Sequence, residues 1–251
     1  SWSKYNPDWE IRFLHKENLT DFVTLPVSEK KLARLSNAAY SDLVRANLLA
    51  RYGGVWCDAT SFCTKPLDDW IDDYMHIDFF AFRNPGKDRV IASWFIAAEK
   101  GSYLMDKFAK ALNSYWGDNN LVNKNKGPLI APFDYFLNRT PKQTKYWFSP
   151  FVTKVLGIYP YFYFHYLFAY LIHKDSVFAG SWACVPSFDA SFPHAILHNK
   201  MLAPVDEINK NHIEKLASPL YKLSWKFDSN LNAKDSSLNY LSQFHLAKPM
   251  T

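Results

Sequence analysis

The sequence has little of what marks several common protein classes. Its 251 residues include only three cysteines, too few for a disulfide framework, so we expect a reducing compartment. There is no internal repeat and no low-complexity tract, and the formal net charge is only +5. Such a small, dispersed excess of basic residues does not predict nucleic-acid binding, although it suits phosphate-bearing ligands or an anionic membrane surface.

Long apolar runs are scarce as well. The longest uncharged run, Val155–Ile172, is borderline in length for a membrane span and contains Gly157, Pro160 and five tyrosines. The first residues, Ser-Trp-Ser-Lys-Tyr, do not form the apolar core of a signal peptide. We therefore expect a cytoplasmic protein, with peripheral association at the inner face of the cell membrane as an open alternative.

Aromatic residues, in contrast, make up 18% of the chain. Aromatic side chains build cores, and they also serve surfaces that stack on sugars or lie at a membrane interface. The aromatic-rich segment 158–172 is expected to be a helix that forms core or the wall of an acceptor cleft. A second interpretation is an interfacial helix that presents a lipid-linked acceptor.

Hydrophobic periodicity predicts the secondary structure. Strands are expected at 9–14, 55–58, 77–82 and 90–98, and helices at 28–35, 41–52, 103–116 and 133–138. A further helix is expected to begin near Pro160 within the segment 158–172. Because strands and helices alternate in the first half, we expect an α/β fold with a mixed central sheet flanked by helices and a more helical C-terminal half. No linker is recognisable, so a single domain over residues 1–251 is expected.

Residues 41–60 hold the most informative pattern in the chain. Ser41 is a candidate N-cap of a helix, and Gly53 suits the left-handed residue that ends it. Gly54 allows a backbone or a ligand to approach closely. A short apolar strand then leads to Asp58, and the end of a core strand is where α/β folds commonly bind ligands.

Three charged residues in this stretch each allow two interpretations. Asp42 and Arg45 are one helical turn apart and should be neighbours. The pair either stabilises the start of the helix or points into a cleft and holds a polyhydroxylated ligand by charge-assisted hydrogen bonds. Asp58 either caps the following turn or binds a divalent cation that also holds phosphate oxygens. These residues alone leave both choices open.

The whole stretch resembles a known signature. The order Ser41-Asp42-x-x-Arg45 followed by Tyr52-Gly53-Gly54-Val55-Trp56-x-Asp58-Ala59-Thr60 is similar to that of the capsular polysaccharide synthesis proteins, which are DXD-type sugar transferases of glycosyltransferase family 32. Further blocks resemble the same family in the expected order: Ala92–Ala98, Gly127-Pro128, Tyr161–Phe168 and Lys222–Lys226.

The resemblance implies a GT-A-like (Rossmann-like) fold and a retaining sugar transfer in bacterial capsule or exopolysaccharide synthesis. The implied partners are a nucleotide-sugar donor, expected to be a UDP-sugar, and a polysaccharide or lipid-linked glycan acceptor. Asp42 and Arg45 would contact the donor, and Asp58 would coordinate Mn²⁺ or Mg²⁺ on the diphosphate. Thr60 stands where the motif has its second acid, so the metal would have only a weak neutral ligand there.

The resemblance also implies donor or nucleotide contacts beyond these acids. They are Gly53, Gly54, Ser93, Trp94, Ser224, Trp225 and Lys226. Lys226 would offset the charge of the departing diphosphate. The residues themselves favour a different interpretation of two of these assignments, with Trp94 a core residue of a strand and 224–226 a surface strand. Family members usually begin with a strand that seats the base, so either that strand lies outside this sequence or the nucleotide pocket is incomplete.

Two other functions stay open at this point. One is a non-catalytic glycan- or nucleotide-binding component of a polysaccharide assembly complex, which the missing second acid would suit. The other is an inverting transferase on the same fold, with Asp134 or another loop acid as the base. His194 and His198 are four residues apart and are either late metal ligands or ordinary surface histidines.

Overall fold

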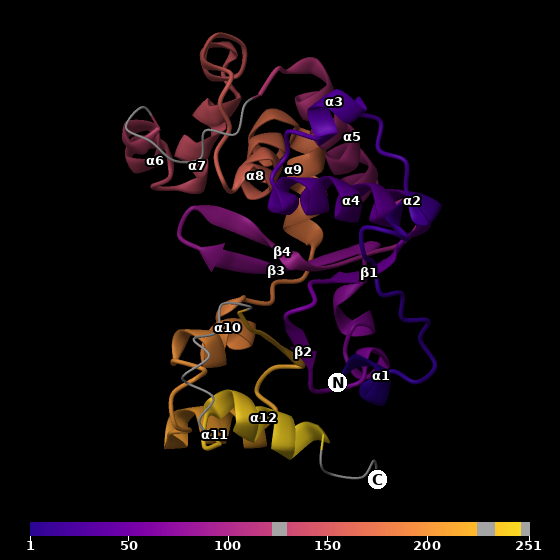
Figure 1. Cartoon of the computed structure of the whole chain (residues 1–251), viewed down its shortest axis with the longest axis vertical. Coiled ribbons are helices and arrows are strands. Elements are labelled where there is room, and N and C mark those ends of the chain that lie inside the picture. The colour runs from indigo at the N-terminus through magenta and orange to yellow at the C-terminus, as the bar shows by residue number, and fades with distance from the viewer. Residues whose placement is uncertain (122–129, 225–233, 247–251) are drawn as a thin grey trace. The chain divides into compact units, whose positions relative to one another are not determined.

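A computed structural model describes residues 1–121, 130–224 and 234–246. The chain divides into two compact units (Figure 1). Unit 1 comprises Ser1–Phe13, Cys57–Asp73 and Asp189–Thr251, and unit 2 comprises Leu14–Trp56 and Tyr74–Phe188. The single domain expected from the sequence stays a prediction, because a division into compact units does not test whether either one folds alone.

Unit 2 is built on a three-stranded sheet with the order β1-β4-β3. The strands are β1 (Gly54–Cys57), β3 (Phe79–Gly86) and β4 (Arg89–Ala98). The hairpin β3-β4 is antiparallel, with Phe79 opposite Ala98, and it confirms the strand–turn–strand unit predicted for this region. β1 ends where the chain passes from unit 2 into unit 1.

Helices α4 (Asn37–Tyr52), α5 (Tyr103–Asp118), α8 (Tyr163–Lys174) and α9 (Ser176–Cys184) lie over one face of this sheet (Figure 1). Shorter elements complete the unit: α2 (Leu19–Phe22), α3 (Glu29–Leu32), α6 (Ala131–Leu137), α7 (Pro141–Thr144), η3 (Lys145–Phe148) and the π-helical turn η4 (Phe151–Leu156). The 3-10 turn η2 (Asp72–Tyr74) leads into unit 2.

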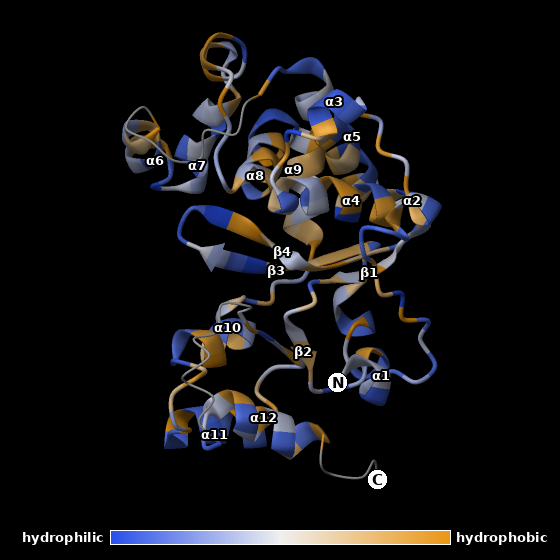
Figure 2. Ribbon diagram, viewed as in Figure 1, coloured by the Kyte–Doolittle hydropathy of each residue, from blue (hydrophilic) through white to orange (hydrophobic). Residues whose placement is uncertain are grey.

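Side chains on both faces of the β3-β4 hairpin are buried. The ring of Phe79 lies 6.2 Å from the rings of both Phe168 and Trp182, which belong to the covering helices. Phe80 is next in the strand and points to the other face, where its ring lies 5.1 Å from that of Tyr74. Figure 2 shows the apolar residues of β3 and β4 toward the body of the unit and a hydrophilic hairpin tip.

Unit 1 contains a second, smaller sheet. Strands β2 (Ser61–Cys63) and β5 (Leu220–Lys222) pair antiparallel, with Ser61 opposite Lys222. The helical elements are α1 (Trp2–Tyr5), η1 (Leu67–Asp69), α10 (Ser191–His198), α11 (Glu207–Glu214) and α12 (Ser237–Leu246). One buried cluster forms the core: Ile196, Met201, Ile213, Tyr221, Leu223 and Leu241.

The sequence-based expectation is confirmed at the level of a mixed α/β fold. The strand predicted at 9–14 is wrong, because this segment has no extended partner and exposes Ile11 and Phe13 to solvent at 49% and 74%. The helix expected to begin near Pro160 begins at Tyr163 and extends to Lys174. The GT-A-like arrangement stays a prediction, since the sheets are small and their β3-β4 and β2-β5 pairs are antiparallel.

No helix within the described ranges combines the length and the apolar character that crossing a membrane requires.

Candidate functional site

The helix that carries Asp42 and Arg45 starts earlier than the sequence suggested. α4 begins at Asn37, and the hydroxyl of Ser36 caps it by accepting the backbone N–H of Ala39 at 3.2 Å. The prediction of Ser41 as the N-cap is therefore wrong, because Ser36 offers an equally good cap one turn earlier. Asp42 consequently lies beyond the first turn, where the helix dipole no longer explains it.

Arg45 is the centre of a buried polar network in unit 2. Its guanidinium lies 3.4 Å from the carboxylate of Asp42, and the side chains of Arg45 and Asp42 are only 6% and 11% exposed. It donates to the carbonyl of Ser41 at 3.3 Å, to the hydroxyl of Ser41 at 3.1 Å and to the carbonyl of Ser93 in β4. The ring of Trp56 lies 5.1 Å from the guanidinium carbon. Arg45 thus ties α4 to the sheet.

These contacts bring together Asp42, Arg45 and Ser93, three residues that the family resemblance assigns to donor binding. The guanidinium hydrogen bonds described above all go to protein oxygens, so they support a role for Arg45 in fixing Asp42 and β4. A direct contact between Arg45 and a donor sugar stays a prediction.

Two side chains of α8 border this network and were not singled out from the sequence. Tyr163 donates its hydroxyl to the carbonyl of Ala39 at 2.9 Å, and burial first, then the charge of Asp42, raises its pKa well above the ordinary value. Burial, followed by the nearby charges of Arg89 and Arg45, lowers the pKa of His165 well below its ordinary value. His165 is therefore neutral in the folded protein at neutral pH.

The two glycines after α4 differ in what surrounds them. Gly53 has φ +71°, and its N–H bonds to the carbonyl of Leu49, as predicted for a helix-ending glycine. A Cβ at Gly53 would lie 2.6 Å from the backbone N of Lys100, so this position needs glycine for packing. A Cβ at Gly54 would meet nothing within 4 Å, although φ is +94°. Only Gly54 has the open surroundings that a bound ligand would need.

Trp94 lies in the core. It is 5% exposed, and its ring stacks on Phe82 with 5.0 Å between centroids. This packing agrees with the structural interpretation given above, and a donor contact by Trp94 stays a prediction.

Asp134, the base considered for an inverting transferase, lies in α6. Asn138 donates to its carboxylate at 3.1 Å, but burial has the larger effect and raises the pKa of Asp134. A raised pKa suits proton transfer, yet it also arises wherever a carboxyl is partly buried.

Asp58 and Thr60 lie in unit 1, where β2 and β5 bring a third residue to them. The pairing of β2 with β5 extends one residue before the start of β2, because Leu223 donates its N–H to the carbonyl of Thr60 at 2.8 Å. Lys222 then donates its ammonium to the hydroxyl of Thr60 and lies 3.9 Å from the carboxylate of Asp58. The side chains of Lys222 and Asp58 are 16% and 28% exposed. Asp58, Thr60 and Lys222 are called the Asp58 cluster below.

Lys222 is the functional candidate that sequence reasoning missed. The block 222–226 was recognised, but its second lysine was chosen as the phosphate-binding cation. Ser224 is partly buried in the structure, whereas Trp225 and Lys226 lie outside the described residues. Alternation along the strand could have suggested that 222, 224 and 226 share a face, but not that Lys222 meets Asp58.

The Asp58 cluster does not fit a divalent cation held by protein ligands alone. Mg²⁺ and Mn²⁺ favour several oxygen ligands, and carboxylates supply most of the charge. Here one carboxylate and one hydroxyl stand beside an ammonium group. Burial, then the charge of Asp58, raises the pKa of Cys57 to about 12, so its thiol remains protonated. In the described part of the chain, no three His, Cys, Asp or Glu residues are grouped as a metal would require.

His194 and His198 form a pair of rings 5.1 Å apart on α10. Among the described residues this pair does not belong to a group of three His, Cys, Asp or Glu side chains, which is what a protein-held metal centre would require.

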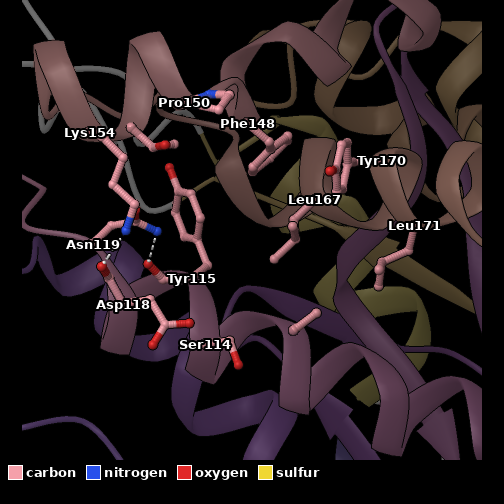
Figure 3. Close-up of a pocket in the computed structure, with 12 residues that line it drawn as sticks. Ser114, Tyr115, Asp118, Asn119, Phe148, Pro150, Lys154, Leu167, Tyr170 and Leu171 are labelled. Atoms are coloured by element: carbon pink, nitrogen blue, oxygen red, sulfur yellow. Dashed lines mark hydrogen bonds between the residues drawn. The ribbon is translucent and has the colours of Figure 1, made fainter.

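A separate pocket of about 420 Å³ opens in unit 2 (Figure 3). Its walls come from α5, α8 and the η3–η4 region and include Tyr115, Phe148, Leu167 and Tyr170. The hydroxyl of Tyr115 is buried and has no hydrogen-bond partner among the described residues. The aromatic segment 158–172 was expected to form core or the wall of an acceptor cleft. Phe164 and Phe168 are fully buried, which confirms that the segment contributes to the core. Other residues of α8 line this pocket. None of the predicted site residues that the structure describes lines it.

Comparison with known proteins gives a family. The family described as capsular polysaccharide synthesis protein matches residues 1–146 and 142–241. A protein of Annulohypoxylon truncatum named O-glycosyltransferase braB is 33% identical over 98 residues, which cover 36% of this chain and 23% of that protein. The chain thus matches less than a quarter of the length of this relative. No solved structure matches the chain.

Proposed function

Because this chain belongs to the capsular polysaccharide synthesis protein family, we propose that it is a glycosyltransferase. It moves a sugar from a nucleotide-sugar donor to a hydroxyl group of a polysaccharide or lipid-linked glycan acceptor. The family match over residues 1–146 and 142–241 carries this proposal. The name of the relative from Annulohypoxylon truncatum, an O-glycosyltransferase, supports it.

In the proposed reaction the bond between the sugar C1 and the diphosphate oxygen breaks, and a bond from the acceptor oxygen to C1 forms. The acceptor proton passes to the leaving diphosphate, and the anomeric configuration is retained, so no separate general base is needed. Asp42, fixed by Arg45, positions the donor sugar. The Asp58 cluster faces the diphosphate. UDP-sugars are the first donors to test. A divalent cation stays a prediction of the resemblance, and no step is assigned to it here.

The single acid of the Asp58 cluster favours one other function, a non-catalytic binding component of a polysaccharide assembly complex. A protein of that kind would bind a nucleotide sugar or a glycan without releasing the nucleotide. Donor turnover separates the two functions directly.

The test is nucleotide release from a panel of UDP-sugars and GDP-sugars with an added glycan acceptor. We expect release from at least one donor, and we expect Asp58→Asn to lower its rate by about tenfold or more, as is typical when a charged group at a reacting centre is removed. Asp72→Asn is the matched control, because Asp72 is an exposed carboxylate of the same unit. Absence of release from every donor would overturn the transferase proposal, and an unchanged rate in Asp58→Asn would remove Asp58 from the site.

A further inference from the structure

We propose that Lys222 binds the donor diphosphate and supplies the positive charge that the resemblance assigns to a divalent cation. The Asp58 cluster would then take a nucleoside diphosphate without a metal. This inference rests on the proposed function, because that function makes a diphosphate the natural ligand.

The first support is the way the backbone fixes Lys222. The antiparallel register puts Lys222 opposite Ser61, and the hydrogen bond from Leu223 to the carbonyl of Thr60 extends that register toward Asp58. The ammonium group is anchored further, since it donates to the carbonyl of Leu223 at 3.0 Å and to the hydroxyl of Thr60. The cation is therefore held at one place by a sheet rather than by a mobile loop.

The second support is the charge of the cluster. A motif with two carboxylates carries two negative charges and becomes neutral when it binds a divalent cation. In this chain Thr60 is uncharged, and the single negative charge of Asp58 lies 3.9 Å from the single positive charge of Lys222. The cluster thus reaches neutrality with no metal. A second carboxylate at position 60 would add a negative charge beside the ammonium and weaken its attraction for phosphate.

The third support is access. The side chain of Lys222 is 16% exposed and that of Asp58 is 28% exposed, so both are partly accessible to solvent. At 3.9 Å the carboxylate lies beyond hydrogen-bond distance of the ammonium and acts on it through charge. A lysine ammonium is a compact donor that binds phosphate oxygens well, and its attraction is strengthened where water is partly excluded.

The experiment titrates UDP and GDP into the whole chain by calorimetry, once in EDTA and once with Mn²⁺. We expect at least one nucleotide to bind with the same Kd in both buffers, within about threefold. Lys222→Ala should weaken that binding by about tenfold or more, since it removes a charge-assisted hydrogen bond. Lys215→Ala is the matched control, because Lys215 is an exposed lysine of the same unit, and its Kd should equal that of the unmodified chain.

A second variant tests the same idea by gain of function. In Thr60→Asp combined with Lys222→Ala, the cluster would hold two carboxylates and no ammonium. Mn²⁺ binding followed by electron paramagnetic resonance should appear in this variant and be absent, or weaker by about tenfold or more, in the unmodified chain. Nucleotide binding by the variant should now require Mn²⁺. Circular dichroism confirms that each variant is folded before it is compared.

The outcomes separate the two proposals. Nucleotide binding by the unmodified chain only with Mn²⁺, or equal Kd values for Lys222→Ala and the unmodified chain, would overturn the role of Lys222 and leave the transferase proposal standing. No binding of either nucleotide in either buffer, together with no nucleotide release from any donor, would overturn both.

Discussion

Two charged pairs that include residues of the 41–60 motif have different surroundings. Asp42 and Arg45 lie in unit 2, where the guanidinium is buried and bonded to several protein oxygens. Asp58 meets Lys222 in unit 1 at 3.9 Å, with both side chains partly exposed. A buried arginine bonded to both α4 and β4 supports a fold, whereas a lysine with a partly exposed side chain can also contact a ligand. The comparison predicts that the first pair contributes more to stability and the second more to binding.

The largest expected effect on stability is that of Arg45→Ala. It leaves the buried carboxylate of Asp42 without its charge partner and removes the hydrogen bond to Ser93, so the free energy of unfolding should fall by about 3–5 kcal/mol. Urea denaturation measures the change. Arg51→Ala, an exposed arginine of the same helix, should change the free energy by less than about 1 kcal/mol. Equal losses in the two variants would contradict the comparison.

Next in size is Gly53→Ala, with Gly54→Ala as its matched partner. Both glycines have positive φ, which costs an alanine about 1 kcal/mol. Only at Gly53 would the new Cβ also collide with the backbone of Lys100, so its loss should reach about 2–4 kcal/mol. Thermal unfolding of both variants checks the order. A larger loss for Gly54→Ala would show that Gly53 is not the packing position.

A third effect concerns pH and the core beside Arg45. Because the pKa of His165 is lowered in the fold, the unfolded chain binds its proton more tightly. The free energy of unfolding is therefore higher above the pKa of His165 in the unfolded chain, which is about 6.5. Below that pH it falls by up to about 1.4 kcal/mol per pH unit. Urea midpoints between pH 7.5 and 5.5 should show this decline. His165→Phe should make the dependence shallower, and an identical slope would contradict the assignment.

The smallest expected effect is that of Lys222→Ala on stability. Its ion pair is partly solvated, so the free energy of unfolding should change by about 1 kcal/mol or less. Urea denaturation measures this change, and it can be compared directly with the loss in Arg45→Ala from the same series. A loss as large as that of Arg45→Ala would mean that Lys222 supports the fold, and its proposed role in binding would lose its basis.

Local features of the motif could be predicted from the sequence. The helix-ending role of Gly53, the hairpin of β3 and β4 and the proximity of Asp42 to Arg45 all depend on residues close in the chain. The helix start was misplaced because Ser36 and Ser41 are equivalent as caps, and only tertiary packing decides between them. The alternation of apolar and polar residues at 9–14 predicted a strand, but a strand also needs a partner strand, and none lies beside this segment in the described structure.

The role of Lys222 could not be predicted in the same way. Its contact with Thr60 joins residues 162 positions apart, and it depends on the register of β2 against β5. A shift of one residue would turn Lys222 to the opposite face of the strand. Short strands such as Ser61–Cys63 carry too little pattern to fix that register from sequence.

The most direct test of the whole account is nucleotide release from a matching sugar donor in EDTA, compared between the unmodified chain, Asp58→Asn and Lys222→Ala. The account predicts release by the unmodified chain without added metal and a rate lower by about tenfold or more in each variant. Failure to release nucleotide from any donor, with or without Mn²⁺, would contradict it.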